Sequence, residues 1–123
     1  MPLRCKSESE ILTIFITDPK ILDAATIEQI YKDLVGVLER TEQQNVILDF
    51  QAVQFMSSAA LGMLIRINKK CKEFKANLKL CNIDKDIKQV FKITGLDKVF
   101  TIYKTAEDAA AAFAKSGGLF HRS

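Results

Sequence analysis

Two adjacent serines, Ser57 and Ser58, stand where a hydroxyl group can do chemistry. They precede an apolar run that begins at Ala59, so they fall at the start of an expected helix. A serine at such a position can cap the helix by accepting a hydrogen bond from a backbone N–H. It can also be phosphorylated, because the first-turn N–H groups and the positive end of the helix dipole tolerate a charge of about −1.5 to −2. The residues alone leave both interpretations open.

Apolar side chains precede and follow the serines and would form a small apolar surface around them. A partner packed against them would have to desolvate a new phosphate, so one phosphate can reverse binding without refolding the domain. We expect a partner-binding surface made of Asp23, Asp49, Phe55, Met56, Ser57, Ala59, Ala60 and Leu61. The two aspartates also have simpler interpretations: Asp23 caps a helix, and Asp49 hydrogen-bonds loop amides at a strand end. We expect both to lie near Ser58 at one edge of the sheet.

Several classes of protein are excluded by what the sequence lacks. The only histidine is His121, near the C-terminus, which removes Ser-His-Asp and Cys-His catalysis. The three cysteines, Cys5, Cys71 and Cys81, have no metal-ligand spacing, so no metal and no cofactor is expected. The five glycines form no phosphate-binding loop. The formal charge of +3 is too small to indicate nucleic-acid binding, and no apolar run reaches the roughly 20 residues of a membrane span.

Strand and helix patterns alternate along the 123 residues. β-branched and apolar residues predict strands over 10–17, 45–50, 78–83 and 99–103, with a short pairing strand over 3–6. Helical periodicity starts at Thr26, where Asp23 or a Thr26–Gln29 capping box can begin the helix. Further helices are expected over 58–75, from Asp84 to about Gly95, and after a Thr105 cap. This order predicts one α/β domain with a mostly parallel or mixed sheet of four or five strands and about four helices.

The segment from Val46 to Leu64, with Ile93 to Phe100, resembles a STAS domain of the bacterial anti-sigma factor antagonist type. In that family a buried strand leads to Asp-Ser-(Ser/Thr)-Gly-Leu-Gly at a helix start, and a later Thr-Gly-Leu closes the third helix. Leu61-Gly62-Met63-Leu64 fixes the register, so that Ser58 matches the family's phosphorylated serine and Asp49 its strand aspartate. The similarity covers roughly residues 10–113, and Leu22 to Thr26 resembles the family's first helix entry.

The resemblance implies a switch rather than an enzyme. The unphosphorylated protein would bind an anti-sigma factor that is also a serine kinase, phosphorylation of Ser58 would dissolve the complex, and a PP2C-type phosphatase would restore it. Two positions depart from the family pattern: Ser57 replaces the aspartate before the phosphorylated serine, and Ala59 replaces the residue after it. Ser58 is favoured over Ser57 as the modified residue because of its register and its place in the helix.

Two other hypotheses accompany the switch. One is a STAS scaffold or ligand-binding module that uses the same surface without phosphorylation. The other is a small α/β enzyme that uses Asp23, Asp49 and Ser58 in one polar pocket. We expect residues 1–116 to form the STAS domain and residues 117–123 a flexible C-terminal tail. The protein is expected in the cytoplasm, as a monomer or weak dimer, with no membrane or direct nucleic-acid partner.

Overall fold

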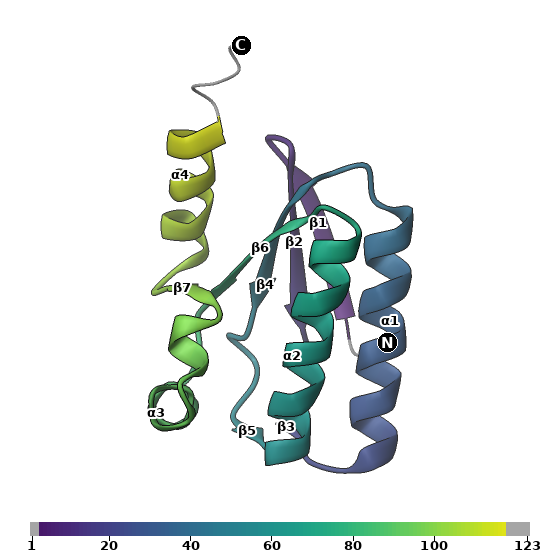
Figure 1. Cartoon of the computed structure of the whole chain (residues 1–123), viewed down its shortest axis with the longest axis vertical. Coiled ribbons are helices and arrows are strands. Elements are labelled where there is room, and N and C mark those ends of the chain that lie inside the picture. Colours follow the sequence, from purple (N-terminus) through teal and green to yellow (C-terminus); the bar gives the residue numbers. More distant parts are fainter. Residues whose placement is uncertain (1–2, 118–123) are drawn as a thin grey trace.

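The computed structural model describes residues 3–117, which form a mixed five-stranded sheet flanked by helices (Figure 1). The strand order is β1-β2-β4-β6-β7. The strands are β1 (Leu3–Glu8), β2 (Ile11–Ile16), β4 (Asn45–Asp49), β6 (Asn77–Cys81) and β7 (Thr101–Tyr103). Only β1 runs antiparallel to its neighbour, and the other neighbouring pairs are parallel. The expected α/β fold is therefore confirmed, including the N-terminal pairing strand.

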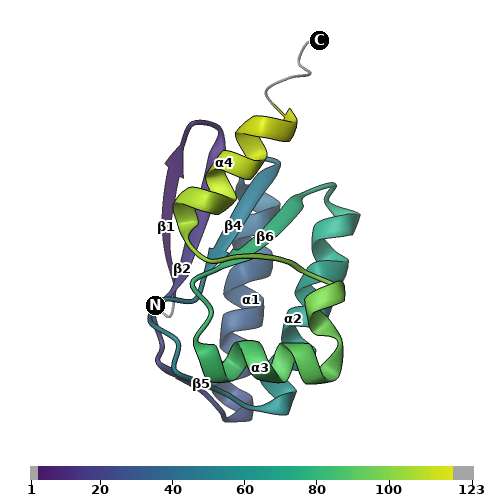
Figure 2. The ribbon, with the colours of Figure 1, turned by 90° about the vertical axis from the view of Figure 1, so that its left-hand side faces the viewer.

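Helices cover the two faces of the sheet unequally (Figures 1 and 2). α1 (Ala24–Arg40) and α2 (Ser58–Glu73) lie side by side on one face, α4 (Ala106–Gly117) lies on the opposite face, and α3 (Lys85–Thr94) follows β6. The main core lies under α1 and α2, where Val46 and Leu48 of β4 join the buried residues of both helices. A smaller core under α4 contains Ile47 and Phe113. Alternate β4 residues thus serve different faces, which explains why this strand is apolar on both.

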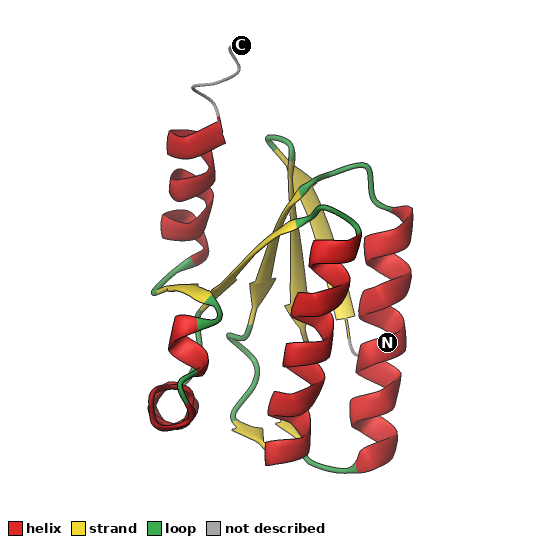
Figure 3. Ribbon diagram, in the orientation of Figure 1, coloured by secondary structure: helices red, strands yellow, loops and turns green. Residues whose placement is uncertain are grey.

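A second, two-stranded sheet lies at the end of the domain where α1 and α2 begin (Figure 3). β3 (Lys20–Ile21) pairs in parallel with β5 (Phe55–Met56). Two residues give no recognisable alternation, and the sequence prediction therefore missed both strands. This small sheet connects the start of α1 to the start of α2.

Several predicted boundaries change in the structure. α1 starts with an Asp23 cap, whereas Gln29 donates a hydrogen bond to Asp33, so the alternative capping box does not form. The last strand begins at Thr101 rather than at residue 99, because a 3₁₀ turn (Leu96–Lys98) follows the left-handed Gly95. Thr105 caps α4 as expected.

The predicted tail falls at the end of the described chain. Gly117 is the last residue of α4, and residues 118–123, which include His121, lie outside the described residues. Within residues 3–117, every helix is too short or too polar to cross a lipid bilayer. The same residues contain no group of three or more His, Cys, Asp or Glu side chains placed to hold a metal ion.

Candidate functional site

The small sheet β3–β5 positions the two serines. Backbone N–H groups of Gln54 and Phe55 donate to the carbonyl of Pro19 at 2.8 and 3.0 Å, and the N–H of Ser57 donates to the carbonyl of Ile21 at 3.0 Å. Upstream, buried Val53 anchors the same segment in the core. The chain therefore enters α2 along a fixed path, and both serines lie beside the turn that leads into α1.

Ser57, not Ser58, is the helix cap. Ser57 has extended backbone angles, its Oγ accepts a hydrogen bond from the N–H of Ala60 at 3.2 Å, and its carbonyl accepts the N–H of Leu61. Ser58 is the first residue of α2 and is exposed. The two interpretations of the serine pair thus fall on different residues, which leaves the Ser58 hydroxyl without a capping role.

The surface beside Ser58 is smaller than the sequence predicted. Phe55 is 53% exposed, and Ala59 is exposed as well. Ala60 and Leu61, however, are buried in the core under α2, because helical periodicity turns them towards the sheet. Met56 is half-buried and packs against the same core. Ala60 and Leu61 therefore support the site from below and offer a partner almost no side-chain surface.

Two residues that the sequence reasoning did not place on this surface flank it. The ammonium of Lys20 lies 5.9 Å from the centroid of the Phe55 ring, because the pairing of β3 with β5 sets the two residues opposite each other. Leu22, next along the chain from the paired Ile21, is 50% exposed. The one sequence signal for this part of the surface was Pro19, which marks the turn before β3. The pairing of two-residue strands cannot be predicted from sequence.

Asp23 caps α1 as expected. Its carboxylate accepts hydrogen bonds from the N–H of Thr26 at 3.0 Å and from the Thr26 hydroxyl at 2.7 Å. The side-chain hydrogen bond from Thr26, followed by the backbone one, lowers the pKa of this carboxyl below its usual value. Asp23 lies two residues beyond Ile21, whose carbonyl accepts from Ser57, so it belongs to the same end of the domain as the serines.

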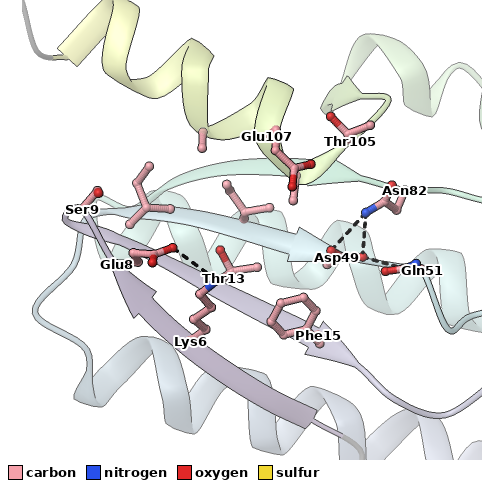
Figure 4. Close-up of a pocket in the computed structure, with 14 residues that line it drawn as sticks. Lys6, Glu8, Ser9, Thr13, Phe15, Asp49, Gln51, Asn82, Thr105 and Glu107 are labelled. Atoms are coloured by element: carbon pink, nitrogen blue, oxygen red, sulfur yellow. Dashed lines mark hydrogen bonds and ion pairs between the residues drawn. The ribbon is translucent and has the colours of Figure 1, made fainter.

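Asp49 ends β4, and its side chain is buried on the face of the sheet opposite α2, so it does not form part of an exposed partner-binding surface. Its side chain is only 2% exposed and accepts hydrogen bonds from the N–H of Gln51 at 2.8 Å and from the Asn82 amide at 3.1 and 3.2 Å. Figure 4 shows it on the α4 side of the sheet, whereas α2 covers the other side. Asp49 does bind a loop amide, as its simpler interpretation predicted. The cavities that Asp49 lines on the described part of the chain include neither Asp23 nor Ser58.

The fold and the site define an α/β domain with an exposed serine at the start of a helix. The family model described as STAS domain matches residues 4–109. A Bordetella bronchiseptica protein named as an anti-sigma factor antagonist, BtrV, is 29% identical over 93 residues, which cover 76% of this chain and 79% of that protein. The chain belongs to the STAS domain family, and the relative that it resembles is named as an anti-sigma factor antagonist.

Solved structures show the same fold. An anti-sigma factor antagonist (STAS) domain protein from Planctomyces limnophilus superposes with a TM-score of 0.78 at 23% identity, covering 91% of this chain and 97% of that one. The Bacillus cell fate determinant SpoIIAA, in its phosphorylated form, gives a TM-score of 0.64 at 18% identity, covering 89% of this chain and 97% of that one. The resemblance to a STAS domain over residues 46–64 and 93–100 is confirmed by the family model.

Proposed function

We propose that this protein binds an anti-sigma factor through the surface around Ser58 and is released from it by phosphorylation of Ser58. The observation that carries the proposal is that the two serines have different roles in the structure. Ser57 caps α2, so the exposed Ser58 hydroxyl can be modified without loss of the cap. SpoIIAA, which shares the fold, exists in a phosphorylated form.

The start of α2 is suited to accept a phosphate on Ser58. The first amides of a helix lack intrahelical partners, and Ser57 Oγ occupies only that of Ala60. The first turn of α2 contains no acidic residue that would repel the new charge. Lys20, across the small sheet at Phe55, adds a positive charge nearby. The phosphorylated domain therefore keeps its fold.

The same phosphate would weaken the complex with a partner. Exposed apolar surface at Phe55 favours a partner that buries it, and Ser58 lies three residues further along the chain. A phosphate there carries a charge of about −1.5 to −2 and must lose its bound water when the partner docks. The first-turn amides of α2 replace only part of that hydration, so docking carries a desolvation cost. Binding and phosphorylation therefore compete for the same patch.

The enzymes of the cycle lie outside this chain. We assign the forward step to a partner that is both anti-sigma factor and serine kinase: the Ser58 oxygen attacks the γ-phosphorus of ATP, the hydroxyl proton is lost, and ADP leaves. A PP2C-type phosphatase would reverse the modification by hydrolysis, releasing inorganic phosphate. The chain itself serves as substrate and ligand.

Mass spectrometry of the protein purified from its native cells tests the assignment. Trypsin releases residues 41–66 as one peptide, in which Thr41, Ser57 and Ser58 are the only hydroxyl side chains. Fragment ions between residues 56 and 59 then place the phosphate. We expect it on Ser58. Its absence after incubation with the cognate kinase and ATP would instead support the scaffold that uses this surface without phosphorylation.

Binding measurements on variants test the consequence. Ser58→Ala should bind the anti-sigma factor at least as tightly as the unmodified protein. Ser58→Asp or Ser58→Glu should bind at least about tenfold more weakly, because each places a charge in the patch that the partner would bury. The acidic variants should keep the melting temperature, since an acid in the first turn of a helix is favourable. Equal affinity of all three variants in calorimetry would refute the switch.

A further inference from the structure

A cavity of about 440 Å³ lies on the sheet face opposite the Ser58 helix. It forms because α4 packs on β4, β6 and β7, while the β1–β2 hairpin beside it carries no helix on this face (Figures 2 and 4). Its walls combine the apolar side chains of Ile11 and Phe15 with polar groups of Thr13, Asp49 and Glu107. Apolar walls with a few convergent polar groups are typical of small-molecule sites.

The cavity reaches the carboxyl ends of the parallel strands, where α/β proteins place their ligands. Asp49 ends β4, Asn82 follows β6, and Thr105 lies between β7 and α4. Asn82 adopts a left-handed backbone conformation, with φ of 55°, and directs its amide to both oxygens of Asp49. The Asn82 amide thereby fixes the orientation of the buried carboxylate.

Two carboxylates that line this cavity, those of Asp49 and Glu107, are not neutralised by an ion pair within residues 3–117. Asp49 is held by the Asn82 amide and the Gln51 N–H. The cavity's own cation, Lys6, pairs with Glu8 at 3.2 Å. Arg4 stacks on Phe15, 5.1 Å from the ring centroid, and lines an adjoining hollow.

The Cys81 thiol is affected by the same two carboxylates. Burial raises the pKa of the Cys81 thiol to about 12, and the charges of Asp49 and Glu107 contribute in the same direction. Attraction of a cation by Asp49 is strengthened because this carboxylate is shielded from solvent.

We propose that this cavity binds a small organic cation, an amine or guanidinium with a short aliphatic chain. Its charged end would lie between Glu107 and the mouth above Asp49, within reach of the hydroxyls of Thr13 and Thr105. Its aliphatic part would cover Ile11 and the exposed part of Phe15. The site is separate from the Ser58 surface, so it adds a ligand to a protein whose proposed function requires none.

Titration of the ¹⁵N-labelled full chain with agmatine tests the site. Agmatine carries an amine and a guanidinium on a four-carbon chain, and 1,4-butanediol and succinate are four-carbon controls with no charge and with negative charge. We expect saturable shifts of the Thr13, Asn82 and Thr105 amides with agmatine alone. Linear shifts spread over the surface, or an equal response to the diol, would overturn the proposal.

Variants separate this site from the rest of the protein. Glu107→Gln, on the exposed start of α4, should weaken agmatine binding by about tenfold, because one of two attracting charges is removed. Asp49→Asn, with the melting temperature as a check of folding, should weaken it further. Asp97→Asn, an exposed acid after α3, and Ser58→Ala should leave it unchanged. Equal affinity in Glu107→Gln and Asp97→Asn would refute a specific site.

Discussion

The assignment of the α2 cap to Ser57 makes a quantitative prediction about stability. Ser57→Ala removes the hydrogen bond from the Ala60 N–H and leaves that donor without its cap. Loss of such a cap costs about 0.5–2 kcal/mol, and the N···O distance of 3.2 Å, long for a hydrogen bond, places the expected cost near the middle of that range, at about 1 kcal/mol. Ser58→Ala should change stability by less than about 0.5 kcal/mol, because the exposed hydroxyl caps nothing.

Thermal unfolding followed by circular dichroism measures the difference. With about 2.1 cal/mol/K of unfolding entropy per residue, a chain of 123 residues has about 0.26 kcal/mol/K, so 1 kcal/mol lowers the melting temperature by about 4 °C. Ser57→Asp should restore the cap, since aspartate accepts the same N–H, and its charge suits the helix start. A larger loss in Ser58→Ala than in Ser57→Ala would refute the reasoning, because it would place the cap on the residue that we propose is phosphorylated.

Three further predictions concern the rest of the fold. Gly95→Ala should destabilise the protein by about 1–2 kcal/mol in chemical denaturation, because Gly95 has φ of 79° and ends α3 in the left-handed conformation; an unchanged midpoint would contradict this. Phe91→Ala should cost about 3–5 kcal/mol in the same assay, since Phe91 is fully buried. At pH 8, iodoacetamide should label exposed Cys5 well before Cys71 and Cys81, whose pKa values burial raises to about 11 and 12, and mass spectrometry would detect the reverse order.

The raised thiol pKa values also fix the direction of a pH effect. A thiol whose pKa is higher in the folded than in the unfolded chain binds its proton more tightly when folded. Its contribution to stability is therefore complete below pH 9.0, the ordinary pKa, and is lost as the pH rises towards 11 and 12. The denaturant concentration at the unfolding midpoint should decrease as the pH rises from 9 to 11. Replacing Cys71 with serine should remove the part of that decrease that comes from the Cys71 thiol.

The sequence predicted the architecture well because most elements have long, strong periodicity. The helical spacing defined an apolar face of α1 made of Ile27, Ile30, Tyr31, Leu34, Val35 and Leu38. Four of the six are buried, and Tyr31 and Val35 are partly buried against the same core. The strand expected to begin at Val99 was wrong at its start, because β-branched and aromatic residues also occur in the turn that follows α3. Local patterns identify an element more reliably than they place its first residue.

The site was harder to predict because it depends on which face of the sheet each side chain occupies and on which short strands pair. In β4, Leu48 and Asp49 must point to opposite faces, so one of them had to leave the α2 side. Nothing in the sequence says which face α2 covers, so the burial of Asp49 on the opposite face could not be predicted. Ser57 and Ser58 were equally good caps by residue type, and only the backbone angles at Ser57 separate them.

The small sheet β3–β5 has a consequence for timing. It ties residues 20–21 to residues 55–56, so the approaches to α1 and α2 are held to each other before any modification occurs. Under the proposed function, the domain has no slow internal step: nothing must unfold, swing or repack for the mark on Ser58 to take effect. The delay between signal and response is then set wholly by other molecules, by how fast the kinase and phosphatase act and how fast the partner dissociates.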